Sequence, residues 1–169
     1  MNETDLSFCP RCGAKTRAKG KNLRICPKCH LKNYTNPRPC NAVIFYNKTG
    51  EILMVKRKLD PQKDKWDLPG GFINPNETLE ESVKREIQEE LTLSLKGFTY
   101  LSSYIDTYLF ENVRYSTLCF VFSMHFDAKN VIRCADDATS YGWFSQKNIP
   151  SKDIAFDGIR RALKDYFTR

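Results

Sequence analysis

The sequence predicts an α/β protein in which a mixed β-sheet lies between helices and follows a small cysteine-rich ribbon. Three observations lead to this prediction. Two Cys-x-x-Cys pairs lie within the first thirty residues, and several runs of β-branched and aromatic residues come after them. Two helical patterns, one inside this series of runs and one at its end, carry apolar stripes. Strands flanked by such helices pack as a sheet between helical layers.

Length and composition fit one well-packed domain with a small appendage, since 41% of the 169 residues are apolar. No apolar run approaches the roughly 20 residues of a membrane span. The first residues do not combine a basic region with an apolar stretch, as a secretory signal does. We therefore expect a cytoplasmic protein with no membrane partner, whose seven cysteines act as metal ligands or free thiols rather than in disulfides.

The net charge of +7 arises in the first forty residues, which hold nine Lys and Arg against two acids. This asymmetry predicts two units with different surfaces, a ribbon over residues 1–36 and a second domain over residues 37–169. A basic ribbon permits contact with nucleic acid. A solvated basic surface explains the charge at least as well, because no aromatic-rich stacking platform accompanies it in the sequence.

The first unit carries Cys9 with Cys12 and Cys26 with Cys29, and thirteen residues separate the two pairs. Four thiolates on two tight turns match the tetrahedral ligand set of a zinc ion. Because sulfur would fill all four positions, we expect the zinc to be structural rather than catalytic. His30, next to the last cysteine, is then a turn residue outside the ligand set.

The second unit opens with a proline-marked junction over residues 33–39, and turn residues then separate its β-prone runs. In chain order we expect a strand over 40–46, a turn over 47–50, a strand over 51–58, a polar loop over 59–65, strands over 98–106 and 114–126, a short strand over 141–144, and a last helix capped by Ser151 or Asp153.

Between these strands lies a helix that the sequence marks clearly. Thr78 to Glu81 reads as a capping box, so Thr78 should precede the first turn. Apolar residues then recur every fourth position and form a stripe that should bury against the sheet: Leu79, Val83, Ile87 and Leu91. At 100° per residue, Glu86 and Glu90 border this stripe and Glu89 lies further round.

The same helix is crowded with acids. Glu86 and Glu90 repel each other at i,i+4, and Glu89 adds a third carboxylate to that flank. A solvated acidic face accounts for Glu81 and Arg85, which are spaced as a favourable i,i+4 pair. The three later glutamates have no cation in the turn after them, so a bound divalent metal explains the cluster better.

The stretch from Gly71 to Leu93 resembles the box of the Nudix hydrolase family, G-x5-E-x7-R-E-U-x-E-E-x-G-U, where U is bulky and apolar. Here the box reads Gly71, Glu77, Arg85, Glu86, Ile87, Glu89, Glu90, Thr92 and Leu93. Thr92 stands where the family has glycine, and a β-branched residue resists the left-handed conformation that glycine takes at a helix end. We therefore expect a different helix exit. The resemblance covers roughly residues 40–167 and implies a Nudix-type sheet between helices.

This resemblance implies hydrolysis of the pyrophosphate bond in a nucleoside diphosphate linked to another group. It would assign Mg²⁺ or Mn²⁺ to three carboxylates and one carbonyl: Glu86, Glu89, Glu90 and Gly71. Arg85 would pair with Glu77 and hold the segment rigid. Glu89 is our first choice as general base. Asp136 and Asp137 are weaker choices, because a solvated loop explains them better.

The layout of a four-cysteine ribbon, an Asn-Pro-Arg-Pro junction and this domain is similar to that of NADH pyrophosphatases. It implies a dinucleotide substrate such as NADH or NAD, or one like ADP-ribose, and it makes a homodimer plausible. The downstream motif SQPWPFPxS of that subfamily is absent. Tyr108 lies fifteen residues beyond Leu93, near the base-stacking tyrosine of some dinucleoside-polyphosphate hydrolases. Packing in an aromatic strand is the alternative explanation for this tyrosine.

A second class of function is a nucleotide-sensing Nudix module that binds without hydrolysis, with its basic ribbon touching nucleic acid or protein. The intact acid triad favours the enzyme, because a pure binding module has no need to retain carboxylates that repel one another.

Overall fold

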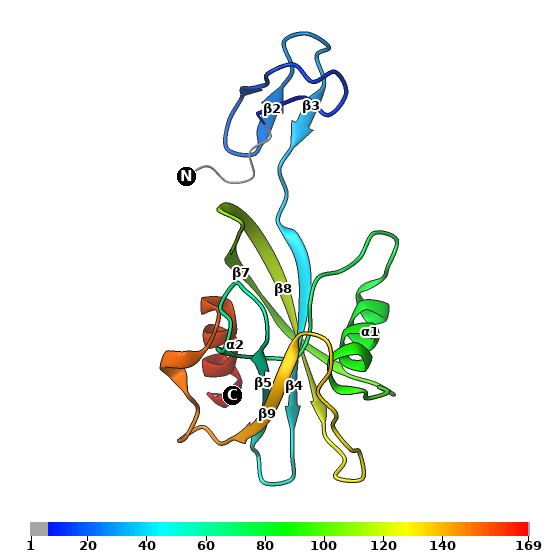
Figure 1. Ribbon diagram of the computed structural model, residues 1–169, viewed down its shortest axis with the longest axis vertical. Coiled ribbons are helices and arrows are strands. Elements are labelled where there is room, and N and C mark those ends of the chain that lie inside the picture. The colour runs from blue at the N-terminus through cyan, green and yellow to red at the C-terminus, as the bar shows by residue number, and fades with distance from the viewer. Residues whose placement is uncertain (1–6, 169) are drawn as a thin grey trace.

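The computed structural model describes residues 7–168, which form a small ribbon and a larger α/β domain (Figure 1). The ribbon is a three-stranded antiparallel sheet in the order β1-β2-β3, with β1 at Arg17–Ala18, β2 at Leu23–Ile25 and β3 at Lys32–Tyr34. A short extended segment leads from β3 into the domain. No helix among the described residues is long and apolar enough to cross a bilayer.

The domain is built on a six-stranded sheet in the order β6-β5-β4-β8-β7, with β9 also paired to β5. Its strands are β4 (Arg38–Tyr46), β5 (Ile52–Arg57), β6 (Trp66–Asp67), β7 (Thr99–Phe110), β8 (Val113–His125) and β9 (Ala138–Phe144). β4 and β8 run parallel over nine paired positions, whereas β5 and β7 pair antiparallel with their neighbours. The predicted mixed sheet is therefore confirmed.

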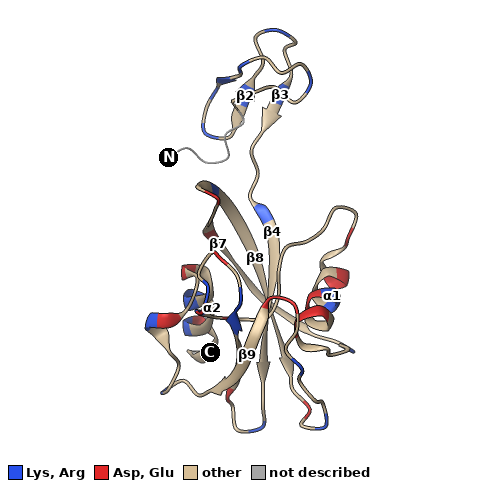
Figure 2. Cartoon of the chain, viewed as in Figure 1, with Lys and Arg blue, Asp and Glu red and all other residues tan. Residues whose placement is uncertain are grey.

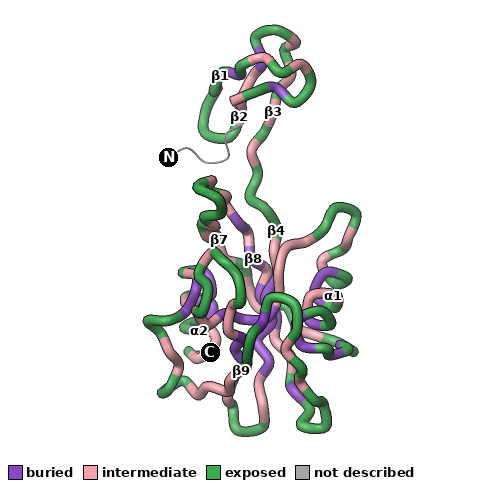
Figure 3. The backbone as a smooth tube through the Cα atoms, in the orientation of Figure 1, coloured by how far each residue is buried: buried purple, intermediate pink, exposed green. Residues whose placement is uncertain are grey.

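Helices cover both faces of this sheet. α1 (Leu79–Leu91) lies on one face, and the 3-10 turn η1 (Ser151–Asp153) with α2 (Asp157–Phe167) lies on the other (Figure 1). Alternate residues of β4 serve the two layers, since successive side chains of a strand point to opposite faces. Val43 and Phe45 belong to the core under α1, and Ala42 and Ile44 belong to the core under α2. The buried positions accordingly follow the middle of the sheet (Figure 3).

The predicted caps of the last helix are wrong. Ser151 and Asp153 form η1, and α2 begins only at Asp157, without a side-chain cap from the residue before it. The Asp106 carboxylate on β7 instead accepts a hydrogen bond from the Gly158 N–H. A negatively charged carboxylate at this end also interacts favourably with the positive end of the helix dipole. The cap therefore comes from a strand about fifty residues earlier.

The strand predicted to end at Asp106 continues to Phe110 and turns back through Glu111 and Asn112, both with positive φ. The resulting β7–β8 hairpin carries Tyr108 opposite Tyr115. Tyr108 consequently lies on a regular strand whose partner β8 borders β4, and this position brings it to the site described next.

Candidate active site

Two glycines fit the loop before α1 against β4. The Asn41 N–H donates to the Gly71 carbonyl at 2.8 Å, and the Val43 N–H donates to the Pro69 carbonyl at 2.9 Å. Gly70 has φ of +142°, and a Cβ there would lie 2.3 Å from the Asn41 carbonyl oxygen. Only glycine meets both demands. The loop is thereby held to the sheet at the point from which α1 departs.

α1 begins and ends much as its sequence indicates. Thr78 and Glu81 form the predicted capping box, in which the Thr78 N–H donates to the Glu81 carboxylate at 2.8 Å. The predicted pairing of Glu81 with Arg85 is wrong, because the cap already engages that carboxylate. Thr92 ends the helix at φ 58° and ψ 34°, the left-handed conformation, and its N–H donates to the Gln88 carbonyl. The expected change of exit shape does not occur.

The Arg85 guanidinium connects three carboxylates and the loop. It donates twice to Glu77, at 2.7 and 2.9 Å, once to Glu86 at 2.7 Å and once to Glu89 at 2.9 Å. It also donates to the Phe72 carbonyl at 3.0 Å. These contacts hold the pKa of Glu77 down at about 2, chiefly through the hydrogen bonds from Arg85.

The repulsion among the glutamates is therefore smaller than the sequence suggested. The sequence has no cation in the turn after the cluster, but in the folded protein Arg85 supplies one from the turn before it. Arg85 offers enough N–H groups, in a planar fork, to serve several carboxylates at once. Glu90 is the member of the cluster that this fork does not reach.

Glu90 is buried, with 8% of its surface exposed, and its carboxylate accepts a hydrogen bond from the Gly70 N–H at 3.0 Å. It forms no ion pair with any residue that the structure describes. Burial raises the pKa of Glu90 to about 8, and the nearby carboxylates of Asp67 and Glu86 add to this rise. Burial also raises the pKa of Glu86, against the effect of Arg85. A cation bound here would compensate this buried acidic charge.

The donor atoms fit Mg²⁺ or Mn²⁺, which prefer carboxylate and carbonyl oxygens. The Glu86 carboxylate lies so close to Gly71 that an added Cβ would come within 2.5 Å of it. The Gly71 carbonyl, although bonded to a backbone N–H, keeps a second lone pair. Among groups of three or more His, Cys, Asp and Glu residues within residues 7–168, however, only the cysteine cluster places its ligand atoms within 4.8 Å of one another. Glu86 and Glu89 accept hydrogen bonds from the same Arg85 nitrogen, whereas Glu90 accepts its hydrogen bond from the Gly70 N–H.

A pocket of about 350 Å³ joins this acidic region to an aromatic wall. It brings together most of the predicted site residues, namely Gly71, Arg85, Glu86, Glu89, Glu90, Tyr108, Asp136 and Asp137. Glu77 is not among its lining residues and acts on the pocket through Arg85. The pocket continues past the glycine loop to the first turn of α2, at Gly158 and Ile159.

The aromatic wall is centred on Tyr108. Its ring centroid lies 5.2 Å from that of Phe72, edge to face, and 5.7 Å from that of Phe156, at an angle of 30°. The Arg57 guanidinium lies over the Phe156 ring at 5.1 Å. Phe72 follows the box glycine directly, but no sequence signal marked Phe156, which reaches the pocket only through the packing of α2.

No pattern in the sequence marks the buried acid Asp67, which lies three residues before Gly70. Asp67 forms an ion pair with Arg57 at 3.2 Å and accepts a hydrogen bond from the Leu68 N–H. Burial raises its pKa to about 6, although Arg57 opposes the rise. Both residues of this pair line the pocket.

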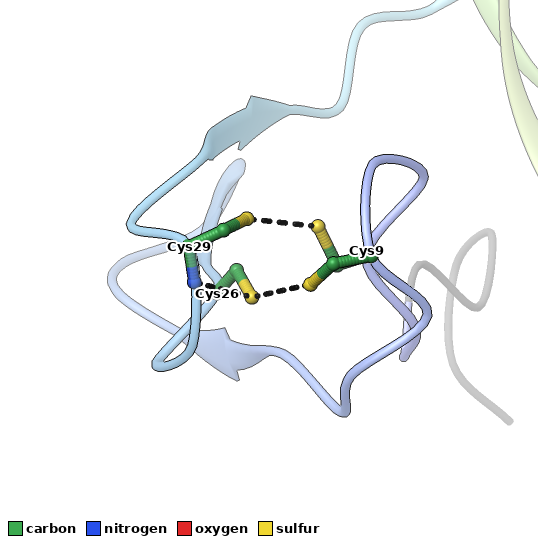
Figure 4. Close-up of side chains that lie close together, drawn as sticks. Cys9, Cys26 and Cys29 are labelled. Carbon is green, nitrogen blue, oxygen red and sulfur yellow. Dashed lines mark hydrogen bonds between the residues drawn. The ribbon is translucent and has the colours of Figure 1, made fainter.

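The four cysteines of the ribbon form a second cluster, with their sulfur atoms within 4.8 Å of one another (Figure 4). Cys9 and Cys29 have sulfurs 3.5 Å apart, as do Cys12 and Cys26. A tetrahedral zinc with bonds of about 2.3 Å needs sulfurs about 3.8 Å apart, so the cluster fits zinc. The Cys29 N–H also lowers the pKa of Cys26 to about 6. His30 is not part of the cluster.

Comparison with known proteins gives consistent matches. The family model of the NUDIX domain matches residues 36–166. An ADP-ribose pyrophosphatase of Methanocaldococcus jannaschii is 34% identical over 150 residues, which cover 88% of this chain and 85% of the relative. The NAD-capped RNA hydrolase NudC of Deinococcus radiodurans is 27% identical over 162 residues, 94% of this chain but 55% of the relative. The chain thus spans about half the length of that protein.

Solved structures agree on the fold. The crystal structure of a NUDIX hydrolase from Nitrosomonas europaea superposes with a TM-score of 0.66 at 28% sequence identity. The superposition covers 95% of this chain and 90% of the other.

Proposed function

Because this chain belongs to the Nudix family, we propose that it hydrolyses the pyrophosphate bond of a nucleoside diphosphate linked to another group, with Mg²⁺ or Mn²⁺ as cofactor. One observation carries the proposal. A single pocket presents the carboxylates of Glu86, Glu89 and Glu90 on one side and the Tyr108 wall on the other. Such a pocket offers oxygen ligands beside a surface on which a base can stack.

The residues around the pocket divide the work. Glu86, Glu89, Glu90 and the Gly71 carbonyl would hold the metal, which supplies charge neutralisation for the pyrophosphate and activation of water. Arg85 and Glu77 keep the carboxylates in position. If one of these carboxylates acts as general base instead of as a metal ligand, we assign that role to Glu89, because 45% of its side chain is exposed against 13% for Glu86, so that a water molecule can reach it.

Two substrate classes suit this pocket, ADP-ribose and NADH-like dinucleotides. The Methanocaldococcus relative, matched over most of both chains, is an ADP-ribose pyrophosphatase. The NudC protein, matched over about half of its length, is an NAD-capped RNA hydrolase. The SQPWPFPxS motif is absent, and so is the proline about sixteen residues beyond the box that many ADP-ribose hydrolases carry, so ADP-ribose is favoured only by the Methanocaldococcus relative. Residence in the cytoplasm, dimerisation and a domain boundary at residue 36 stay predictions.

A substrate panel tests the proposal. Purified protein is incubated with Mg²⁺ or Mn²⁺ and with ADP-ribose, NADH, NAD, dinucleoside polyphosphates, FAD, nucleoside triphosphates or NAD-capped RNA, and products are separated by chromatography. We expect AMP from ADP-ribose or from a dinucleotide, and no AMP when a chelator is present. Binding of these nucleotides without any cleavage would contradict the proposal and favour the sensing module.

A further inference from the structure

The ribbon has a strongly basic surface that the hydrolase function does not use. Residues 7–40 contain nine Lys and Arg and no acid, and eight of these nine side chains are exposed. None of the nine forms an ion pair with any carboxylate in the described part of the chain. Figure 2 shows these cations spread over the ribbon, whereas the acids gather on the domain, notably along α1.

The strand register gathers two of these cations with an aromatic ring on one face of the ribbon sheet. Arg17 pairs with Ile25 and Ile25 with Lys32, while Leu23 pairs with Tyr34. Directly paired residues share a face, as do residues two apart along a strand. Five side chains thus lie together and are called here the ribbon face: Arg17, Leu23, Ile25, Lys32 and Tyr34.

The composition of the ribbon face suits a ligand with both charge and flat apolar surfaces. Tyr34 is 56% exposed, and Leu23 and Ile25 are half-buried beside it. Arg17 and Lys32 are exposed. By contrast, Arg24 belongs to the opposite face and donates to the Thr16 hydroxyl at 2.7 Å. Strand pairing therefore places one exposed aromatic ring beside the two cations, in a ribbon that has no aromatic-rich stretch.

We propose that the ribbon face binds single-stranded nucleic acid, with Arg17 and Lys32 on phosphates and a base stacked on Tyr34. Such sites combine cations along the phosphate backbone of the nucleic acid with aromatic rings on which bases stack. In a duplex the bases are already stacked and cannot lie on Tyr34. An acidic protein would be held by the cations alone and would gain little from the ring.

The ribbon face is also close to the pocket along the chain. Tyr34 and Cys40 are six residues apart, which limits their separation to about 20 Å, and Cys40 and Asn41 line the pocket. Between them, the Arg38 guanidinium stacks on the Tyr115 ring at 3.7 Å and leaves a further cation on this path. This inference goes beyond the hydrolase function and does not rest on it.

Fluorescence anisotropy tests the proposal with the zinc-loaded full chain and labelled RNA or DNA of about twelve nucleotides, a length within the usual site sizes. We expect binding at low salt that weakens as salt rises. Tyr34→Ala should weaken it about tenfold, as expected for a lost stacking contact. The double variant Arg17→Glu with Lys32→Glu should weaken binding at least as much. It should also reduce the slope of the logarithm of the binding constant against the logarithm of salt concentration by roughly one to two.

Matched control variants distinguish binding by the ribbon face from nonspecific attraction to the protein's positive charge. Lys48→Glu with Lys147→Glu removes the same charge from exposed positions of the domain and should change affinity less than about twofold. Zinc content and circular dichroism check that each variant is folded. Loss of affinity confined to the ribbon-face variants supports the proposal, and the better-bound strand identifies RNA or DNA as the source. No binding at low salt, equal loss in the control pair, or wild-type affinity in Tyr34→Ala would overturn it.

Discussion

The Glu86 carboxylate lies against Gly71 so closely that a Cβ on this glycine would be 2.5 Å from its carbon atom. The glycine is required here for space rather than for backbone conformation, since Gly71 does not have a positive φ. Gly70, its neighbour, is required for both reasons, with φ of +142° and a Cβ position that overlaps the backbone of Asn41. The two glycines therefore predict different consequences of the same substitution.

Gly71→Ala should fold but lose turnover. The added methyl displaces the Glu86 carboxylate, and a misplacement of about 1 Å in a catalytic group costs on the order of 100-fold in rate. Steady-state kinetics and thermal melting check this prediction. Gly70→Ala is the comparison, because its strained backbone should destabilise the fold by about 1–3 kcal/mol. Wild-type turnover in Gly71→Ala would contradict the role assigned to Glu86.

The Glu77–Arg85 pair predicts a pH-dependent contribution to stability. Arg85 lowers the pKa of Glu77 from 4.5 to about 2, so the ionised carboxylate stabilises the folded state above about pH 4.5. That contribution is lost as the pH falls toward 2, where Glu77 becomes protonated in the folded protein. Glu77→Gln should therefore melt earlier than wild type at pH 7, and the difference should shrink below pH 4. A constant difference from pH 7 to pH 3 would contradict this account.

The elements predicted best are those whose signals are local. The capping box and the i,i+4 stripe placed α1 at its observed start, and the cysteine spacing marked the ribbon. The start of α2 could not be read in this way, because its capping group is Asp106 from a distant strand. The same limit applies to Phe156, which joins the wall of Tyr108 only when α2 packs on the sheet.

The arrangement around Arg85 was predicted in part. The resemblance implied its pairing with Glu77, which the structure contains. The guanidinium also contacts Glu86, Glu89 and the Phe72 carbonyl, and the last of these contacts cannot be read from sequence spacing.

Thr92 predicts a stabilising substitution. A β-branched residue in the left-handed conformation is strained, at a cost of roughly 1–2 kcal/mol, and the hydrogen bond from its hydroxyl to the Arg133 carbonyl recovers only part of this. Thr92→Gly should raise the free energy of unfolding by about 1 kcal/mol, which corresponds to roughly 2–4 °C in melting temperature. Thr92→Ala, which loses the hydroxyl and keeps the Cβ, should not. A less stable glycine variant would show that the hydroxyl contact dominates.

The cysteine cluster predicts one structural zinc per chain. Replacing Cys9 and Cys26 with serine removes one ligand from each pair, and elemental analysis should then find no tightly bound zinc. Because the fold of such a ribbon depends on its metal, limited proteolysis should cleave within residues 7–34 of the variant. The domain that follows should resist cleavage. Wild-type protein purified without any zinc would refute the ribbon as a metal site.

The most direct test of the central claim is the cleavage of ADP-ribose and NADH by wild type and Glu89→Gln in the presence of Mg²⁺. Glutamine keeps the oxygen that accepts from Arg85 but cannot take a proton from water, so the rate of AMP formation should fall by about 100-fold or more while the melting temperature is unchanged. Glu80→Gln, the same charge change at an exposed position of the same helix, should keep the wild-type rate. Undiminished AMP formation by Glu89→Gln would contradict the account.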